Sequence, residues 1–411
     1  MILLKNGFIV KNNALVKKDI LIDNNKIIKI EDNIDAENAE AYDVNNMLVM
    51  PGLVDCHVHF REPGFEYKET IKTGTYASAK GGITTCMPMP NLNPVPDSKE
   101  HLLKELEIIK RDALINCYPY GSITKGEQGK EPSKVDEFYD LVHAISDDGM
   151  GVNNIPILET QMEKALKYGI VIASHSEDLK YSKNKEPEGE IEAVEREIEL
   201  AKKIGCKYHF CHLSTKKSID LVRQAKREGY KNITCEIAPH HLILNKNLVN
   251  LNPNFKMNPP LRTEEDRLAC IEALIDGTCD IIATDHAPHS EAEKALEFLK
   301  APNGIIGVET MLPLIYTECV KKNIISLDKM LDLMVYNPIK IFNLPKRKLE
   351  VKEIADIAVF DINNLHTYSY GELESLSKNS PFIGYKLYGF NQLTICNGKI
   401  IYNNLGGKYE Q

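Results

Sequence analysis

The pattern of hydrophobic and polar residues divides the chain into three stretches. Near the amino terminus, the apolar runs Ile2–Leu4 and Phe8–Val10 flank Asn6-Gly7, and we predict two short strands joined by a turn there. From residue 51, short apolar runs alternate with longer stretches that have apolar residues at helical spacing. From about residue 344 short strand-like runs return, and Asn397-Gly398 between two of them indicates a hairpin.

The middle stretch contains eight strand-like runs, nearly all separated by helical segments. The third run is Leu114–Tyr118, and a helix is expected after it from Ser133 to about Leu141. Two further helices have clear starting signals, Ser98 as an N-cap and Thr263 with the acidic residues that follow it. This alternation predicts an α/β fold, a (β/α)8 barrel of the TIM type.

The two terminal stretches consist of short strand-like runs and lack the strand–helix alternation of the middle stretch. Since chain termini often lie close together, we expect them to combine into one smaller β-rich domain. The expected division is residues 1–50 as the amino-terminal part of that domain, 51–343 as the barrel, and 344–411 as the carboxy-terminal part.

Composition excludes several classes of protein. The net charge is −9 over 411 residues, and no strongly basic stripe is present, so nucleic acid is not an expected partner. No apolar run approaches the length of a membrane span, and the first residues lack the features of a secretory signal. The ten cysteines include no C-x-x-C pair, and we interpret them as reduced, buried residues of a cytoplasmic protein.

Residue types that bind metal ions follow five of the eight predicted barrel strands. His57 and His59 lie at the end of the first, where alternation places both side chains on one face. The full set, in chain order, is His57, His59, Asp148, His175, His212 and Asp285. Four imidazoles and two carboxylates exceed the needs of one tetrahedral ion. They suit two divalent ions, zinc or a similar metal, that share a bridging carboxylate and a bridging hydroxide. The chemistry indicated is hydrolysis, or its reverse, at an amide-like carbon.

Several motifs resemble those of one enzyme family. Residues 51–64, Pro-Gly-Leu-Val-Asp-Cys-His-Val-His-Phe-Arg-Glu-Pro-Gly, are similar to the signature of the dihydroorotases in the amidohydrolase superfamily. The likeness continues through residues 81–91, 146–149, 211–215, 256–262, 283–289 and 381–385, and so covers essentially the whole chain. It implies a small-molecule substrate and the interconversion of N-carbamoyl-L-aspartate and L-dihydroorotate in pyrimidine synthesis.

The resemblance also implies roles for individual residues. His57 and His59 would bind a first zinc ion and His175 and His212 a second. Asp285 would bind the first ion and act as general acid/base, moving a proton from the bridging water to the leaving ring nitrogen. The implied substrate-binding residues are His59, Arg61, Asn91, Asn258, His289, Asn303 and Gly304.

The bridging ligand is the part of this pattern with more than one candidate. Many members of the superfamily use a carboxylated lysine at the fourth strand, where this chain has Ser-Asp-Asp-Gly. We prefer Asp148 as the bridge, with Asp147 as the alternative and a modified Lys125 less favoured. His240 and His241 are interpreted as supporting residues, and Glu236 as a hydrogen-bond partner of a ligand histidine.

Two other functions stay open on the sequence alone. One is a related cyclic amidohydrolase, an allantoinase or a dihydropyrimidinase, which would not need the carboxylate-binding group of Arg61, Asn91 and His289. The other is a non-catalytic dihydroorotase-like subunit, which would lack some ligand histidines. The sequence does not decide between a homo-oligomer and association with an aspartate transcarbamoylase.

Overall fold

Short, buried apolar runs form the strands of a parallel barrel. The computed structural model describes residues 1–405. Every residue of β6 (Leu53–Val58) and β7 (Ile83–Pro88) is buried. The other barrel strands are β8 (Asn116–Cys117), β9 (Gly121–Ser122), β10 (Ala144–Ser146), β11 (Val171–Ser174), β12 (Lys207–Phe210), β13 (Ile233–Ile237) and β14 (Ile281–Ile282).

The strands pair in chain order, which confirms the predicted barrel. β6, β7 and β8 form one parallel sheet, and β9 to β14 form a second. A parallel bridge between Val58 and His286 joins the two sheets on one side. The predicted third strand is divided into β8, which pairs with β7, and β9, which pairs with β10. Pro119 lies between them and has no N–H to donate to a sheet.

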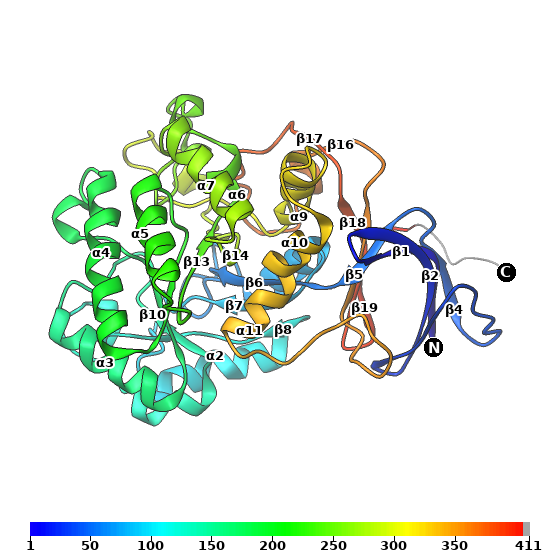
Figure 1. The fold of residues 1–411 in the computed structure, drawn as a ribbon, viewed down its shortest axis with the longest axis horizontal. Coiled ribbons are helices and arrows are strands. Elements are labelled where there is room, and N and C mark those ends of the chain that lie inside the picture. The colour runs from blue at the N-terminus through cyan, green and yellow to red at the C-terminus, as the bar shows by residue number, and fades with distance from the viewer. Residues whose placement is uncertain (406–411) are drawn as a thin grey trace.

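Helices surround this barrel (Figure 1). The long ones are α1 (Ile71–Lys80), α2 (Lys99–Asp112), α3 (Ile155–Tyr168), α4 (Pro187–Ile204), α5 (Lys216–Arg227) and α7 (Glu264–Asp276). The short ones are α6 (Pro239–Ile243), α8 (Glu291–Lys294), α9 (Met311–Ile315), α10 (Leu327–Leu331) and α11 (Asn337–Ile341). The predicted caps are confirmed, since Ser98 and Thr263 accept hydrogen bonds from the first turns of α2 and α7. Among the described residues, no helix has the length and hydropathy to cross a bilayer.

The helix predicted for residues 133–141 is wrong. The segment contains two 3₁₀ turns, Val135–Glu137 and Tyr139–Leu141. Val135 and Phe138 are both fully buried, and a spacing of three residues matches the 3₁₀ repeat. Two 3₁₀ turns therefore place both Val135 and Phe138 in the core, and no α-helix is needed to bury them.

The terminal stretches share one sheet beside the barrel, as predicted. The amino-terminal strands are β1 (Ile2–Lys11), β2 (Ala14–Asp23), β3 (Lys26–Glu31), β4 (Glu40–Asp43) and β5 (Leu48–Pro51). The carboxy-terminal strands are β15 (Ile357–Asp361), β18 (Phe390–Cys396) and β19 (Lys399–Asn403). The order is β19-β18-β15-β5-β1-β2-β3, and antiparallel pairing of β15 with β5 joins the two ends of the chain. In Figure 1, β1, β2, β5, β18 and β19 lie together beside the barrel.

Two turn predictions in this sheet have different outcomes. Asn397 and Gly398 both have positive φ, 50° and 75°, as a tight hairpin requires. The turn predicted at Asn6-Gly7 is wrong, because β1 continues through these residues with a register shift between Leu4 and Gly7. Asn6 takes a φ of 67° in this bulge, and its N–H donates to Asp19 Oδ1 at 2.7 Å.

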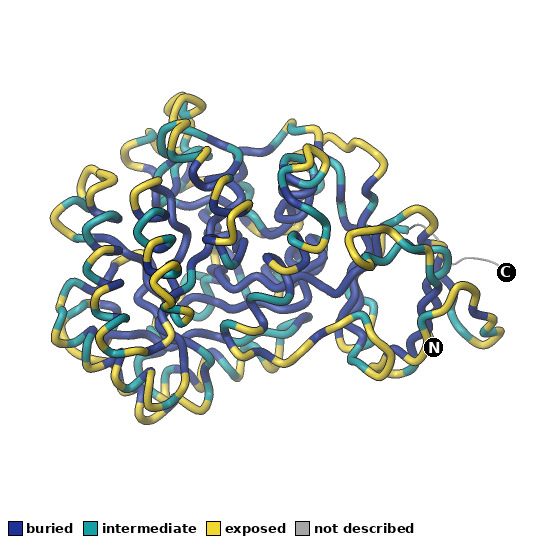
Figure 2. The backbone as a smooth tube through the Cα atoms, viewed as in Figure 1, coloured by how far each residue is buried: buried dark blue, intermediate teal, exposed yellow. Residues whose placement is uncertain are grey.

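A long connection leaves the sheet and returns to the barrel. It runs from residue 362 to 389, and we call it the C-terminal excursion. It contains β16 (His366–Thr367), the 3₁₀ turn Tyr370–Glu372 and β17 (Lys386–Leu387). Buried apolar residues of the excursion pack in one cluster with Ile305, in the connection after β14, and Leu314 of α9. Figure 2 shows the buried barrel strands and the more exposed loops around them.

Candidate metal centre and active site

The six predicted ligands lie at the carboxyl ends of barrel strands. His57 is in β6, and His59 follows that strand directly. The others follow β10, β11, β12 and β14 within three residues; they are Asp148, His175, His212 and Asp285. All six side chains are buried. The end of a barrel where the strands terminate is where catalytic residues of this architecture gather.

One carboxylate lies among four imidazoles. Asp148 Oδ1 is 3.3 Å from His57 Nε2, 3.3 Å from His212 Nε2 and 3.6 Å from His175 Nδ1. Its second oxygen, Oδ2, is 3.3 Å from His59 Nε2. Asp148 therefore has the geometry expected of a carboxylate shared by two ions.

Asp285 lies on one side of this group. Its Oδ1 is 3.1 Å from His59 Nε2 and 3.5 Å from His57 Nε2. On the other side, His175 Nδ1 and His212 Nε2 are 3.0 Å apart. The six residues thus divide into two neighbouring sets, with Asp148 reaching both.

The donors fit divalent metal ions. His57 Nε2 is buried and has no hydrogen-bond partner within the described part of the chain, although it faces two carboxylates. Burial raises the pKa of Asp148, but the charge of His57 and hydrogen bonds from His175 and His212 lower it well below its usual range. An ionised carboxylate among imidazole nitrogens, with no thiolate in the set, is a donor set for zinc and similar divalent ions.

The two alternatives to Asp148 point elsewhere. Asp147 Oδ1 accepts hydrogen bonds from the N–H groups of Ile123 and Thr124 at 2.8 and 3.0 Å, and Oδ2 accepts from the Thr124 hydroxyl. Asp147 therefore holds the loop after β9. Lys125, the less favoured candidate, has a side chain that is 63% exposed and pairs with Glu131 at 3.0 Å, whereas the six candidate ligands are buried.

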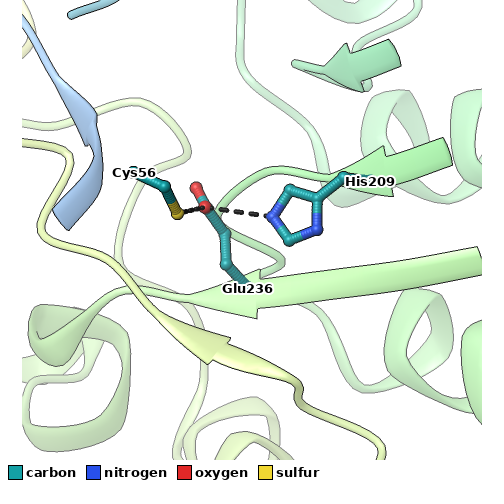
Figure 3. Close-up of side chains that lie close together, drawn as sticks. All are labelled: Cys56, His209 and Glu236. Atoms are coloured by element: carbon teal, nitrogen blue, oxygen red, sulfur yellow. Dashed lines mark hydrogen bonds and ion pairs between the residues drawn. The ribbon is translucent and has the colours of Figure 1, made fainter. Parts of the chain in front are cut away.

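Below the ligand group, Glu236 of β13 organises a buried hydrogen-bond network. Its carboxylate lies 2.6 Å from His57 Nδ1 and accepts from the His212 N–H at 3.2 Å. It also contacts Cys56 Sγ at 3.4 Å and His209 Nε2 at 3.1 Å (Figure 3). The interactions with His57 and His209 outweigh burial and lower the pKa of Glu236. Because an ionised carboxylate only accepts, His57 Nδ1 carries a proton toward Glu236, and Nε2 is the ring nitrogen on the Asp148 side.

The Cys56 thiol supports this network as a hydrogen-bond donor. Burial raises its pKa well above the usual range, so the sulfur keeps its proton. A thiol in this state is a poor metal ligand, since thiolate is the form that binds metals. The group of Cys56, His209 and Glu236 is therefore best described as support for the histidines above it.

A cavity of about 260 Å³ opens beside the ligand group. All seven predicted substrate-binding residues line it: His59, Arg61, Asn91, Asn258, His289, Asn303 and Gly304. Asp148, His175 and Asp285 also line it, which places the candidate metal ligands at its wall.

Sequence reasoning missed three cavity residues, Gly149, Lys185 and Ala287. Lys185 Nζ lies 2.8 Å from both oxygens of Glu177, and Glu177 Oε2 lies 3.2 Å from His175 Nε2. The pair thus fixes the side of His175 that faces away from Asp148. Both residues lie in a polar loop, where no regular spacing of residues indicates a site. The position of Glu177, two residues after the candidate ligand His175, could have suggested a contact with that histidine.

Asn91 and Arg61 both line the cavity, but their side chains have different hydrogen-bond partners. Asn91 Oδ1 lies 2.6 Å from His59 Nδ1, and Asn91 Nδ2 donates to the Asp148 carbonyl at 2.8 Å. Arg61 does not continue the β6 strand, because its φ of 61° turns the chain. The Arg61 Nε–H donates to the Pro288 carbonyl at 3.3 Å.

His289 is neutral, and its hydrogen bonds fix the orientation of its imidazole ring. Burial and the positive charges of Arg61 and Lys68 lower the pKa of His289 to about 3. Its Nε2 lies 2.7 Å from the Asn303 carbonyl, which can only accept, and its Nδ1 lies 3.4 Å from Lys68 Nζ. The proton is therefore on Nε2, and the imidazole connects the loop after β14 to the Asn303-Gly304 turn.

Asn258, another cavity residue with a side-chain amide, lies next to a candidate ligand histidine. Its Nδ2 is 3.1 Å from His175 Nε2. His241 Nε2 lies 3.1 Å from the carbonyl of the next residue, Pro259. Neither His240 nor His241 lines the cavity, in agreement with supporting roles.

The known sequences that are similar to this chain include dihydroorotases. A model described as "Dihydro-orotase-like" matches residues 46–218. A dihydroorotase of Bacillus cytotoxicus is 43% identical, covering 97% of this chain and 98% of the relative. A dihydroorotase of Fusobacterium nucleatum is 45% identical over the same shares.

Solved structures with the same fold include related enzymes. The L-hydantoinase (dihydropyrimidinase) of Arthrobacter aurescens has a TM-score of 0.89 at 25% identity and covers 100% of this chain and 97% of its own. The dihydropyrimidinase of Brevibacillus agri has a TM-score of 0.87 at 22% identity, over 98% and 95%, which supports the fold alone. With relatives above 40% identity along nearly its whole length, this chain belongs to the dihydroorotase family.

Proposed function

We propose that this protein catalyses the reversible cyclisation of N-carbamoyl-L-aspartate to L-dihydroorotate and water, the dihydroorotase reaction of pyrimidine synthesis. The observation that carries the proposal is the position of Asp148 among four imidazoles, at the wall of a cavity that also contains Arg61. This combination suits hydrolytic chemistry on a small substrate that bears a carboxylate.

Two divalent ions, zinc or a similar metal, are part of the proposal. His57, His59 and Asp285 would hold one, and His175 and His212 the other, with Asp148 between them. When bound, such a pair lowers the pKa of a water molecule toward neutrality and polarises the reacting carbonyl.

Asp285 would move the proton. It is buried, and its pKa is lowered because the hydrogen bond with His59 and the charges of nearby histidines outweigh the effect of burial. An ionised carboxylate lining the cavity can take a proton from the attacking water and deliver it to the ring nitrogen as the ring opens. In the cyclisation direction it would remove a proton from the carbamoyl nitrogen.

Arg61, Asn91 and His289 would bind the carboxylate of the ring. A guanidinium can bind a carboxylate through two parallel hydrogen bonds, and the Arg61 side chain lines the cavity. A neutral His289 is a hydrogen-bonding group and does not add a second charge. Asn258 and the backbone of residues 303 and 304 would contact the rest of the ring.

The related cyclic amidohydrolases fit the cavity less well. Dihydrouracil has no ring carboxylate, so its binding would leave the partly buried Arg61 guanidinium without a carboxylate partner in the cavity. The fourth-strand position that carries a modified lysine in many relatives is an aspartate here, with its oxygens toward the histidines. A non-catalytic subunit is disfavoured because all six ligand residues are present and together.

A ring-opening assay tests the proposal. The purified protein is incubated with L-dihydroorotate, and formation of N-carbamoyl-L-aspartate is followed with and without a chelator, next to allantoin and dihydrouracil. We expect turnover of dihydroorotate alone, loss of activity on chelation, and about two metal ions per chain. A fully metallated protein that leaves both dihydroorotate and carbamoyl-aspartate unchanged would contradict the proposal.

A further inference from the structure

The C-terminal excursion reaches the back of the catalytic cavity through a single amide side chain. Asn379 Oδ1 accepts the His289 N–H at 3.2 Å. Asn379 Nδ2 donates to the carbonyls of Ala287 at 3.1 Å and Gly304 at 3.0 Å. The Asn379 carbonyl accepts the Ile306 N–H at 3.1 Å. Asn379 is 3% exposed, so these contacts are shielded from water.

The two segments that Asn379 joins form one wall of the cavity. Ala287 and His289 come from the loop after β14, and Asn303 and Gly304 come from the following turn; all four line the cavity, whereas Asn379 does not. The segments are in close contact. A Cβ on Gly304 would lie 2.7 Å from the Ala287 carbonyl oxygen and 2.9 Å from His289 Cδ2. A small change in their spacing therefore moves groups that face the substrate.

The excursion is itself firmly held. The Ser375 N–H donates to Glu309 Oε1 at 3.0 Å, and the Leu376 N–H donates to Glu69 Oε1 at 3.1 Å. Both glutamates are buried. Phe382 of the excursion belongs to the same apolar cluster as Ile305, next to the Gly304 turn. Asn379 is thus attached to a fixed support on one side and to the cavity wall on the other.

We propose that Asn379 is a positioning residue for the substrate-binding wall. It sets the spacing between His289 and Gly304 so that both segments fit a ring that carries a carboxylate. This inference rests on the proposed function and deepens it. An amide is suited to the role because it supplies one acceptor and two donors where one N–H and two carbonyls converge. A carboxylate at this position would place a negative oxygen against two carbonyl oxygens.

The experiment compares Asn379→Asp with a matched variant, Asn391→Ala. Asn391 is also a buried amide of the carboxy-terminal segment, and its Nδ2 donates to the Ala79 carbonyl at 3.2 Å and to Thr394 Oγ1 at 2.8 Å, away from the cavity. KM and kcat are measured in both directions, together with metal content. Amide hydrogen exchange is measured in peptides covering residues 286–290 and 303–307.

For Asn379→Asp we expect KM to rise about tenfold in both directions, since a lost hydrogen bond misplaces groups that bind substrate and product alike. We expect kcat to change much less, the metal content to equal that of the parent protein, and exchange to be faster in both peptides. For Asn391→Ala we expect lower thermal stability with KM and exchange in these peptides unchanged. Asn379→Ser, which keeps a small polar side chain, is measured in the same way in case the aspartate variant does not fold.

An unchanged KM and unchanged exchange in a folded Asn379 variant would overturn the inference. So would an equal rise in KM for Asn391→Ala, because the effect would then be a general loss of stability. If the parent protein shows no dihydroorotase activity, the proposed function fails, and the exchange comparison still decides whether Asn379 orders the two segments.

Discussion

The two walls of the catalytic cavity are built in different ways. The wall with the candidate metal ligands consists of residues at or near strand ends, where the barrel fixes each backbone position, and Asp148 lies at its centre. The other wall, Ala287 to His289 and the Asn303-Gly304 turn, consists of loops, and its shape depends on hydrogen bonds from side chains outside these two segments. The barrel sheet determines the geometry of the strand-end wall, whereas side-chain hydrogen bonds determine the geometry of the loop wall.

Lys294 illustrates the second kind of support. Its ammonium group donates to the carbonyls of Gly304 at 2.8 Å, Pro302 at 3.1 Å and Lys256 at 3.4 Å. The residue is 8% exposed, and burial lowers its pKa to about 7. Lys294, His289 and Asn379 thus each form a hydrogen bond with a backbone carbonyl of the Asn303-Gly304 turn. We therefore expect that substitutions in the strand-end wall lower kcat and metal binding, whereas substitutions in the loop wall weaken substrate binding and raise KM.

The largest effect is expected for Asp148→Ala. Removing the carboxylate that faces four imidazoles should release metal and remove several kcal/mol of transition-state stabilisation, about a 10³-fold loss of kcat/KM or more. Metal analysis and the ring-opening assay measure both effects. Asp147→Ala is the control, because its carboxylate holds the loop at Ile123 and Thr124; it should lose stability and keep its metal. Two ions retained in Asp148→Ala would refute the bridging assignment.

A smaller effect is expected for Glu236→Gln. This change removes the charge that orients His57 and accepts the His212 N–H, and loss of such a partner lowers metal affinity by about 10–100-fold. Competition with a chelator of known affinity gives the measurement. Glu105→Gln is a matched control, since Glu105 is a buried carboxyl group without hydrogen-bond partners in the described chain. Equal metal affinities in the two variants would show that Glu236 has no influence on the ligands.

Arg61→Lys tests the loop side of the cavity. A lysine keeps the charge but cannot form two parallel hydrogen bonds with a carboxylate. Loss of one charged hydrogen bond, about 1.5 kcal/mol, should raise KM about tenfold with kcat less affected. Arg223→Lys, in ion pairs of α5 with Asp220 and Asp276 that do not line the cavity, should leave KM unchanged. A fall in kcat alone would place Arg61 in the chemical step.

The difference between the walls also explains what the sequence could predict. His57, His59, His175, His212 and Asp285 could be named as candidate ligands because each lies at or just after a predicted strand, and a barrel brings strand ends together. The choice of Asp148 over Asp147 was supported only by resemblance, since alternation along a strand does not extend into the turn after it.

The loop wall was much less predictable. Its cavity residues were named from family resemblance, and its supports, Lys294 and Asn379, were missed. Asn379 is 75 residues from Gly304 in the chain, and no local pattern connects them. The failed turn at Asn6-Gly7 has a related cause, because a bulge and a turn use the same residues, and only pairing with the neighbouring strand distinguishes them.

The smallest expected effect concerns the pH dependence of stability through His289. Its pKa in the folded protein is lowered to about 3, mainly by burial and then by Arg61 and Lys68, whereas an unfolded histidine titrates near ~6.5. Between these values the unfolded state binds more protons, so this residue makes stability rise with pH and fall on acidification. From pH 5.5 to 7.5 the contribution should be about 1 kcal/mol. In urea unfolding of the chelated protein, His289→Gln should reduce that rise by this amount relative to the parent protein. An unchanged pH dependence in His289→Gln would mean that the imidazole takes up its proton equally well in the folded and unfolded protein, and the loop wall would then tolerate a third positive charge beside Arg61 and Lys68.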